Sequence, residues 1–365
     1  MFLLSLDTPT LFRHFTLIFG ATTIAFIMVT ILTKPFYRLL IKLGMRKQLR
    51  DEAADGGSAS IFNQLHKNKR GTPTMGGVLI WGTVALVVFL SPLMQWLNIT
   101  HFNLFNRNET YLPVFTLVAT GVLGLIDDYL NIRAWKIEQL TGEKVHKGLR
   151  VRPKFFWLTF FALMGGMWFY YKLGFDQVNV PGLGDIHLGP WYIALFTFIV
   201  VAGANAVNIT DGLDGLAGGL VVITFASLGI IAYMEGLILL AAFCGLIVGT
   251  TIAFLWFNVP PALFFMGDTG ALALGATMGV IAMMTDSVVV LPLIASMFVV
   301  EAASSGIQMI SKKLRGKKIF LIAPLHHHFE AKGWPEAKVV MRFWILGGFF
   351  ASLGLLIAFL ELLGS

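Results

Sequence analysis

The sequence predicts an all-α, polytopic integral membrane protein, and three observations lead to this prediction. Of the 365 residues, 56% are hydrophobic and only 13% are charged. Apolar runs of about 20 residues, the length that crosses a bilayer as a helix, recur from one end of the chain to the other. The polar segments between them are too short to form a separate soluble domain. We therefore expect a single transmembrane domain over residues 1–365.

Ten apolar segments are predicted to be transmembrane helices. No basic segment precedes the first of them and no small-residue cleavage site follows it, so we expect it to be retained rather than removed as a signal peptide. An even number of spans places both chain ends on the same side of the membrane. The ten predicted spans are residues 16–42, 74–98, 112–130, 154–172, 190–208, 213–233, 236–255, 268–285, 287–311 and 340–363.

Basic residues are distributed unevenly along the chain, and this predicts the orientation. Most of them lie in the segments that follow spans 1, 3 and 9. Because positively charged loops stay in the cytoplasm, we expect these segments to be cytoplasmic and both termini to be external. The net charge of +7 is thereby explained by topology, so we expect no nucleic-acid partner. The single cysteine, Cys244, lies in an apolar run and is predicted to be buried and inert.

Two adjacent carboxylates, Asp127 and Asp128, end the third apolar segment. An ionised aspartate at the membrane centre costs roughly 2.5–3.5 kcal/mol, so we expect the pair at the water interface. Neighbouring residues on a helix point about 100° apart, which means that the two carboxylates cannot do the same job. A solvated helix end is the alternative interpretation.

The segment Asn68-Lys-Arg-Gly-Thr-Pro-Thr-Met-Gly-Gly77 leads from the first cytoplasmic loop into span 2. A threonine cap, a proline in the first turn and glycines for close packing would explain it structurally. The same parts also make an anion site, because they combine an ammonium, hydroxyls and free amides at a helix N-terminus. Lys69 and Thr74 are therefore candidate binding residues.

The junction of spans 5 and 6 is unusually polar for a short turn between two apolar helices. Asn205, Asn208, Asp211 and Asp214 recur every three residues, so neighbours share one face where the segment is helical. A tight turn needs a glycine and one polar cap, but it does not need two carboxylates and two carboxamides. We therefore predict a functional site at this junction.

The junction of spans 7 and 8 contains a further carboxylate. The prolines Pro260 and Pro261 end span 7, and Asp268 begins span 8, where it is either a helix cap or a functional group. Phe264 and Phe265 precede it. We expect both rings to be exposed and to offer a flat apolar surface on which another ring can stack.

Span 9 carries four polar residues on one helical face: Glu301, Ser304, Ser305 and Gln308. They either hydrogen-bond to a neighbouring helix or form the wall of a hydrated groove. The next loop contains three consecutive histidines, His326, His327 and His328. Consecutive histidines do not have the usual spacing of helical metal ligands, and no cysteine accompanies them, so we expect their imidazoles to face phosphates instead.

All these motifs are predicted at cytoplasmic helix ends. A site there would gather five carboxylates, which repel one another unless a cation lies among them. Hard oxygen donors without cysteine select Mg²⁺ or Mn²⁺, and lysine and histidine beside such an ion suit a pyrophosphate. The sequence has no GxxxxGK[ST] loop and no strand-borne GxGxxG, which argues against P-loop and Rossmann proteins. We predict an enzyme with one water-borne and one lipid-borne substrate. A transporter is the alternative, although the acids cluster at one face and the halves show no evident repeat.

Five strings carry a resemblance to a known family: GTPTMGG (71–77), IDDY (126–129), NAVNITDGLDGLAGG (205–219), FFMGDTG (264–270) and APLHHHFE (323–330). With them, essentially the whole chain resembles the phospho-N-acetylmuramoyl-pentapeptide transferases, within the polyprenyl-phosphate N-acetylhexosamine-1-phosphate transferase superfamily. TPTMGG and the triple histidine favour this branch over relatives that use UDP-N-acetylglucosamine.

The resemblance implies a reaction in the bacterial inner (cytoplasmic) membrane. UDP-N-acetylmuramoyl-pentapeptide and undecaprenyl phosphate would give lipid I and UMP with Mg²⁺, in a homodimer. Since one phosphoanhydride replaces another, no ATP is needed. We favour direct attack by the lipid phosphate over a covalent aspartyl intermediate, because that phosphate is already a competent nucleophile.

The resemblance also implies residue roles. Asp127 and Asp128 would be the acidic pair of catalysis, and Asp268 would hold Mg²⁺ with Asn205 as a second ligand. The lipid tail would follow span 9. The substrate-binding residues would be Asn208, Asp211, Gly212, Asp214 and Phe265 on the uridine side, and Lys69, Thr74, His326, His327 and His328 at the phosphates and the sugar.

The sequence departs from the family at one position. The acidic motif of the family usually reads Asp-Asp-x-x-Lys, but Asn131 occupies its last position here. The contact that this lysine would make is therefore in doubt, and Arg133 or Lys136 are candidates to replace it.

Overall fold

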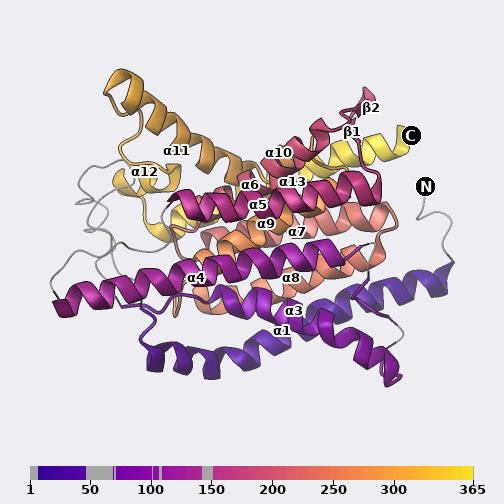
Figure 1. Ribbon diagram of the computed structural model, residues 1–365, viewed down its shortest axis with the longest axis horizontal. Helices are drawn as coiled ribbons and strands as arrows, with labels where there is room; N and C mark the ends of the chain where they lie inside the picture. Colours follow the sequence, from indigo (N-terminus) through magenta and orange to yellow (C-terminus); the bar gives the residue numbers. More distant parts are fainter. Residues whose placement is uncertain are drawn as a thin grey trace.

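The computed structural model describes residues 7–46, 69, 71–100, 102–106, 109–141 and 151–364. It is a bundle of long helices whose axes run roughly in one direction (Figure 1). Seven of the basic residues that predict the orientation lie outside the described ranges: Lys47, Arg50, Lys67, Arg70, Lys144, Lys147 and Arg150.

Helices account for every predicted span, and one further helix, α12, lies between the last two spans. They are α1 (Thr8–Leu43), α3 (Gly77–Trp96), α4 (Tyr111–Thr141), α5 (Val151–Trp168), α6 (Trp191–Thr210), α7 (Leu216–Met234), α8 (Ile238–Asn258), α9 (Asp268–Met284), α10 (Leu291–Ile294), α11 (Ser296–Arg315), α12 (Leu325–Ala331) and α13 (Glu336–Gly364).

Two predicted spans are less regular than expected. Span 4 consists of α5 followed by a π-helical turn, η3 (Phe169–Leu173). Span 9 is divided at Ala295 into the short α10 and the longer α11. Both irregularities depend on local backbone geometry, which hydropathy alone does not reveal.

Seven helices of the described chain are long and apolar enough to cross a membrane. These are α1, α3, α4, α6, α7, α8 and α13, whereas α9 is apolar but has only 17 residues. The protein is therefore an all-α, multi-pass membrane protein. The count of ten membrane spans stays a prediction, because α5, α9 and α11 fall outside this group.

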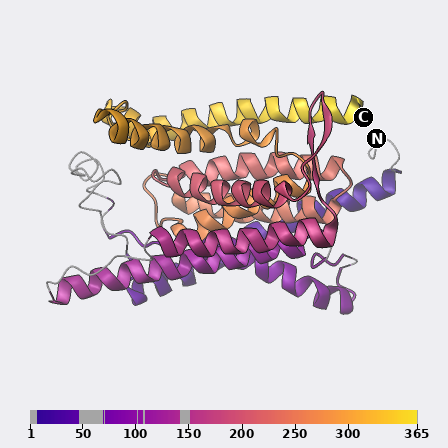
Figure 2. The same ribbon diagram turned by 45° about the horizontal axis from the view of Figure 1, so that its top comes forward.

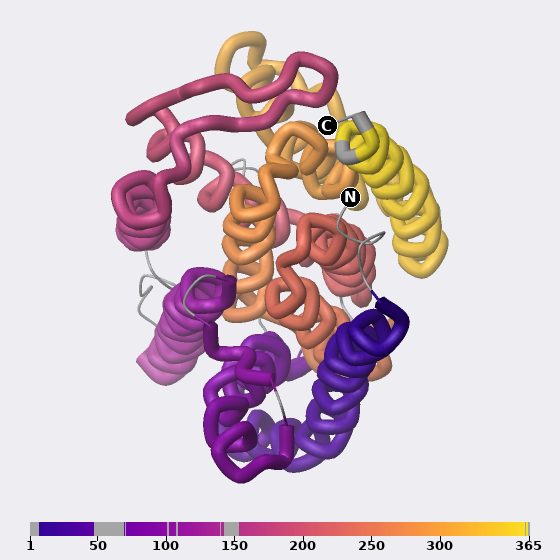
Figure 3. The backbone as a smooth tube through the Cα atoms, turned by 90° about the vertical axis from the view of Figure 1, so that its right-hand side faces the viewer, coloured from indigo at the N-terminus to yellow at the C-terminus, as the bar shows by residue number. Residues whose placement is uncertain are grey.

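The first turn of α1 and the C-terminal end of α13 lie at one end of the bundle (Figures 1 and 2). Helix α12 and the C-terminal ends of α1 and α4 lie at the opposite end. This arrangement agrees with an even number of passes through the bundle. Figure 3 views the end with the two termini and shows a hairpin of two strands beside them.

A short β-hairpin connects η3 to α6. Strand β1 (Gln177–Val180) pairs antiparallel with β2 (Gly184–His187), with Val178 opposite Ile186. The turn contains Gly182, whose φ of 79° is open to glycine at no steric cost. Four-residue strands are too short to give a convincing alternating pattern in the sequence.

Helix α9 lies in the interior, where it packs against α4 and α6. Nearly all of its side chains are buried. Its crossing with α6 is close, because a Cβ added at Gly203 would lie 2.5 Å from the carbonyl oxygen of Gly275. Small residues let helix backbones approach in this way, and here they bring the N-terminus of α9 against its neighbours.

Candidate active site

The N-terminus of α9 is enclosed by backbone from two other helices. A Cβ added at Gly77 of α3 would lie 2.3 Å from Cα of Gly270, and one added at Gly124 of α4 would lie 2.3 Å from the carbonyl oxygen of Asp268. Side chains at these two positions would therefore push α3 or α4 away from α9. The glycines in TPTMGG and near IDDY hold the two motifs against FFMGDTG.

Backbone hydrogen bonds join two of the predicted motifs directly. The amide of Phe265 donates to the carbonyl of Pro73 at 2.9 Å, and the amide of Gly76 donates to the carbonyl of Phe265 at 2.8 Å. Thr74 is buried within this pairing. A Cβ added at Gly267 would lie 2.9 Å from Oγ1 of Thr74 and 2.6 Å from Oδ2 of Asp128, so Thr74 sits beside the acidic pair.

The two adjacent aspartates have different partners, as predicted from their helical spacing. Asp128 accepts hydrogen bonds from the amides of Asp268 at 3.3 Å and Thr269 at 3.1 Å. It therefore caps α9, where a carboxylate is favoured by the free amides and the helix dipole. Asp127 points elsewhere, toward the ammonium of Lys154.

Lys154, the fourth residue of α5, lies among the acids. Its Nζ is 3.3 Å from Oδ2 of Asp127 and also pairs with Oδ2 of Asp268. Asn208 of α6 completes the cluster by donating from Nδ2 to Oδ1 of Asp268 at 2.8 Å. Four elements thus converge on this point, and we call Asp127, Asp128, Lys154, Asn208 and Asp268 the acidic centre.

Lys154 was not among the predicted site residues, so its place in the acidic centre was missed. Lys136, a proposed replacement for the missing family lysine, instead donates to the carbonyl of Leu43 at 3.0 Å. Asn131, which occupies the lysine position, donates to Asp127 at 3.4 Å. Lys154 is one turn before the buried Leu158, and this inward-facing spacing was the signal that could have identified it.

A second cluster, which we call the lysine centre, consists of Lys69, Asp214 and Glu336. Nζ of Lys69 is 2.7 Å from Oδ1 of Asp214 and also pairs with Glu336, the first residue of α13. Glu336 accepts from the amide of Asp214 at 2.7 Å, and Oδ2 of Asp214 accepts from the amide of Ala262 at 3.0 Å. Lys69 and Asp214 therefore meet, and their role as binding residues stays a prediction. Glu336 was not among the predicted site residues.

The prediction that both phenylalanines are exposed is wrong. Phe264 is fully buried and packs against Phe254 and Phe257 of α8. Phe265 is 8% exposed, with Nζ of Lys69 6.0 Å from the centre of its ring. Only Phe265 thus lies next to a candidate binding residue. An apolar pair in a loop gives no sign of which ring meets the core.

The three histidines have three different environments. His326 is fully buried and its Nδ1 lies 2.9 Å from Glu301 of α11. His327 pairs through Nδ1 with Glu330 at 2.7 Å. His328 accepts a hydrogen bond through Nδ1 from the amide of Leu321 at 3.1 Å. The last of these holds a loop together, with the His328 ring also against Phe320 and Phe329.

Gly212 lies against the first two histidines. A Cβ added at Gly212 would lie 2.2 Å from Nε2 of His326 and 3.2 Å from Nε2 of His327. The predicted uridine-side segment and the histidine segment are therefore in contact. Asp211 ends α6 immediately before this contact.

Asn205 does not meet Asp268 through any hydrogen bond of the described residues, and its Nδ2 donates to the carbonyl of Val201 at 2.7 Å. The neighbouring carboxamide, Asn208, is the one that bonds Asp268. The periodicity of the junction predicted that both would share a face with Asp211. It could not show which of them reaches α9.

The polar stripe of span 9 faces inward and anchors the loop that carries the histidines. Ser304 accepts from the amide of Leu325 at 3.0 Å, and Gln308 accepts from the amide of Phe320 at 3.1 Å. Glu301, Ser304 and Gln308 are buried, which favours the hydrogen-bonding interpretation over a hydrated groove. The opposite face of α11 exposes apolar side chains, including Ile310 and Leu314.

The acidic centre has the donors that a hard cation requires. Asp127 and Asp268 share one ammonium, so their carboxylates face a common point where positive charge is accommodated. Both oxygens of Asp128 are engaged by α9 amides. Among the described residues, no group of three or more His, Cys, Asp or Glu side chains is arranged to hold a metal ion. The donor set thus fits Mg²⁺ in chemistry, while a preformed cage is not present in that part of the chain.

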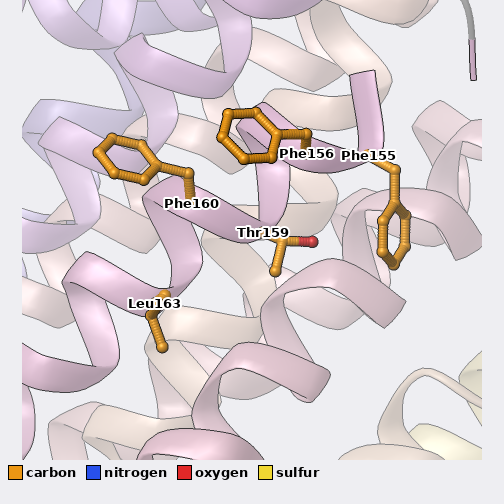
Figure 4. Close-up of a pocket in the computed structure, with 5 residues that line it drawn as sticks. All are labelled: Phe155, Phe156, Thr159, Phe160 and Leu163. Atoms are coloured by element: carbon orange, nitrogen blue, oxygen red, sulfur yellow. The ribbon is translucent and has the colours of Figure 1, made fainter. Parts of the chain in front are cut away.

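An apolar hollow lies on α5 (Figure 4), and no residue of the acidic centre lines it. Lys154 and Leu158 lie on the inward face of α5, whereas the hollow occupies the outward face, where Phe156 is 61% exposed. The hollow is therefore a surface feature of the bundle. Its lining residues are Phe155, Phe156, Thr159, Phe160 and Leu163.

Known proteins match this chain over most of its length. The family model for glycosyl transferase family 4 matches residues 110–286, and signature 1 of the phospho-N-acetylmuramoyl-pentapeptide-transferases matches residues 69–80. A phospho-N-acetylmuramoyl-pentapeptide-transferase of Geobacillus sp. is 36% identical over 92% of this chain and 96% of the relative. One from Pelobacter propionicus is 38% identical over 77% of this chain and 78% of the relative. The matched segments contain every residue of the acidic centre.

Proposed function

Since the chain belongs to the phospho-N-acetylmuramoyl-pentapeptide-transferase family, a group of phosphoglycosyl transferases of peptidoglycan synthesis, we propose that it transfers phospho-N-acetylmuramoyl-pentapeptide from UDP to undecaprenyl phosphate. The products would be lipid I and UMP. The observation that carries this proposal is the acidic centre, where Asp127 and Asp268 share the ammonium of Lys154 at the N-terminus of the buried helix α9.

Charge supports the proposal at this point. The diphosphate of the nucleotide sugar and the phosphate of the lipid carry several negative charges, and these must be neutralised in the transition state. Lys154 supplies one positive charge, and the free amides at the start of α9 supply further hydrogen-bond donors. The carboxylates of the acidic centre would hold a metal cation, which supplies the rest of the positive charge.

Mg²⁺ is proposed as that cation. Asp268 and Asp127 would hold it, because both expose oxygens to the point where the ammonium of Lys154 lies. When bound, Mg²⁺ neutralises phosphate charge and makes the β-phosphorus more electrophilic. Asn205 would become a ligand only if its side chain rotated away from the carbonyl of Val201. Asn208 already bonds Asp268 and is the better-placed carboxamide.

The reaction is proposed as a direct displacement. An oxygen of the lipid phosphate forms a bond to the β-phosphorus of the nucleotide sugar, and the bond from that phosphorus to the bridging oxygen of UMP breaks. Asp127 would orient the lipid phosphate through Lys154, whereas Asp128 keeps α9 in place. Trapping of a phosphosugar on Asp127 or Asp128 without lipid acceptor would contradict direct displacement.

The nucleotide is proposed at the lysine centre and the adjoining segment. Gly212, Asp214 and Phe265 lie next to Lys69 or to the histidines, and with Asp211 they would form the uridine side. In this arrangement Lys69 exchanges a carboxylate partner for the substrate diphosphate. His326 and His327 would face the sugar and phosphates.

The setting of the reaction is also a proposal. Ten spans would place both chain ends outside and the acidic centre at the cytoplasmic face of the bacterial inner membrane, as the distribution of basic residues predicts. The whole chain would be one catalytic domain. A homodimer is the expected oligomer.

A substrate comparison tests the proposal. Purified protein in lipid nanodiscs is supplied with undecaprenyl phosphate, Mg²⁺ and either UDP-N-acetylmuramoyl-pentapeptide or UDP-N-acetylglucosamine, and UMP is quantified. We expect UMP from the first nucleotide only. UMP from the second would assign the chain to a different substrate, and flux of substrate into liposomes without UMP would favour a transporter.

A further inference from the structure

Glu301 and His326 form a buried pair, and Glu301 has no role in any step above. Both side chains are fully buried, on α11 and α12 respectively. Oε2 of Glu301 lies 2.9 Å from Nδ1 of His326, and Oε1 accepts from the backbone amide of the same residue at 3.1 Å. One carboxylate thus holds both the ring and the backbone of His326.

This geometry selects one tautomer of the imidazole. An ionised carboxylate only accepts hydrogen bonds, so in the neutral ring the proton is on Nδ1 and Nε2 is a bare acceptor. Nε2 of His326 is buried and has no partner among the described residues. It is aimed at Gly212, where an added Cβ would lie 2.2 Å away.

Anchoring the loop does not need an ionic group at this point. Ser304 already holds the amide of Leu325, and Gln308 holds the amide of Phe320. Both are neutral side chains of the same stripe. A buried carboxylate is costly to desolvate, so its presence beside two neutral anchors points to a task beyond anchoring.

We infer that Glu301 is a positioning residue. It fixes the His326 imidazole with Nε2 unprotonated and pressed against Gly212, and the ring thereby holds the segment Asp211–Asp214 in its nucleotide-binding conformation. The assignment of a nucleotide to this segment rests on the proposed function, whereas the tautomer and its dependence on Glu301 do not.

Histidine side-chain ¹⁵N NMR of the full chain in nanodiscs tests the tautomer without any substrate. His326→Asn identifies the signal by its loss. We expect a protonated Nδ1 and a bare Nε2 in the wild type, and a mixture of tautomers in Glu301→Gln, because a carboxamide can donate to Nδ1 as well as accept from it. An Nε2-protonated ring in the wild type, or an unchanged signal in Glu301→Gln, would overturn the inference.

Kinetics then test the consequence. Glu301→Gln is expected to lower kcat/KM for the nucleotide sugar about 10- to 100-fold, the range typical of residues that orient a functional histidine, with the KM for the lipid acceptor unchanged. The double variant Glu301→Gln/His326→Asn should be within about twofold of His326→Asn alone, since residues that act through one another are not additive.

The matched control is Glu361→Gln, the same chemical change near the C-terminal end of α13, where Oε2 accepts from the amide of Gly182 at 3.0 Å. It should keep wild-type kinetics. Independent, additive losses in the Glu301/His326 double variant would contradict a positioning role. A wild type that releases no UMP would contradict the proposed function. The NMR result would still test the tautomer of His326 independently.

Discussion

Asp128 of α4 caps the helix that begins with Asp268, because its Oδ1 accepts the backbone amide of Asp268 at 3.3 Å. A residue in IDDY thus fixes the position of the aspartate in FFMGDTG, 140 positions later in the chain. The adjacent Asp127 pairs with the ammonium of Lys154. The two neighbouring carboxylates therefore have different roles: Asp128 caps α9, and Asp127 forms an ion pair with Lys154.

This division predicts different effects of two identical substitutions. Asp128→Asn places an amide group where two backbone amides need acceptors, so we expect a loss of about 1–2 kcal/mol in stability together with loss of activity. Asp127→Asn should lower activity at least 100-fold with a change in melting temperature below about 1 °C. Thermal unfolding of both variants, alongside UMP release, measures the split. Equal destabilisation by the two would contradict separate roles.

Lys154 is predicted to be required for turnover. Lys154→Met keeps the aliphatic length but removes the charge shared by Asp127 and Asp268, and we expect UMP release to fall roughly 100-fold. Lys136→Met is the matched control, since Lys136 bonds only a carbonyl among the interactions described for it. It should retain most of the activity. Near-normal turnover by Lys154→Met would remove Lys154 from the mechanism.

Close glycine contacts at α9 are predicted to be indispensable. Gly124→Ala puts a methyl 2.3 Å from the carbonyl oxygen of Asp268, which only backbone movement can relieve. We expect a loss of about 2 kcal/mol or more in stability and a large loss of activity. Gly306→Ala in α11 has open space around the new methyl and should be neutral or slightly stabilising. Thermal unfolding in detergent compares the two, and a well-folded, active Gly124→Ala would show that the contact is looser than described.

Asp286 predicts a pH dependence at the end of the bundle that carries the termini. Burial, with a further contribution from Asp185, raises the pKa of Asp286 from 3.8 to about 6. The folded state then binds more protons than the unfolded state between about pH 4 and 6, so this group's contribution is present below pH 4 and is lost as pH rises through 6.

Asp286→Asn removes that dependence and keeps an acceptor for the amide of Asn179, which Asp286 binds at 2.9 Å. The variant should melt about 1–2 °C higher than the wild type at pH 8 and at the same temperature at pH 4. Melting curves at the two pH values check this. A lower melting temperature at pH 8 would mean that the ionised carboxylate is stabilising there.

The sequence predicted the helices well because apolar length is sufficient to define them in a membrane protein. It also predicted which motifs meet, since each ends or begins a helix on the same side. Contacts that depend on which face of a helix points inward were harder to predict from the sequence. Lys154 resembled other basic residues of its loop until its inward face was known. Phe264 enters the core only because α8 supplies Phe254 beside it.

The polar stripe of α11 illustrates the same limit. Its spacing showed one face, but the partner of that face is a loop that follows α11 in the chain rather than another long helix. Sequence reasoning considered only helices and water as partners. Likewise, Asn205 and Asn208 are equivalent by periodicity, and only the crossing of α6 with α9 brings Asn208 to Asp268.

The most direct test of the central claim is UMP release by the wild type and by Asp268→Asn. Purified protein would receive UDP-N-acetylmuramoyl-pentapeptide, undecaprenyl phosphate and Mg²⁺, with each component omitted in turn. We predict UMP that requires all three components and disappears in Asp268→Asn while the variant remains folded. Wild-type protein that is folded but releases no UMP, or full activity in Asp268→Asn, would contradict the account.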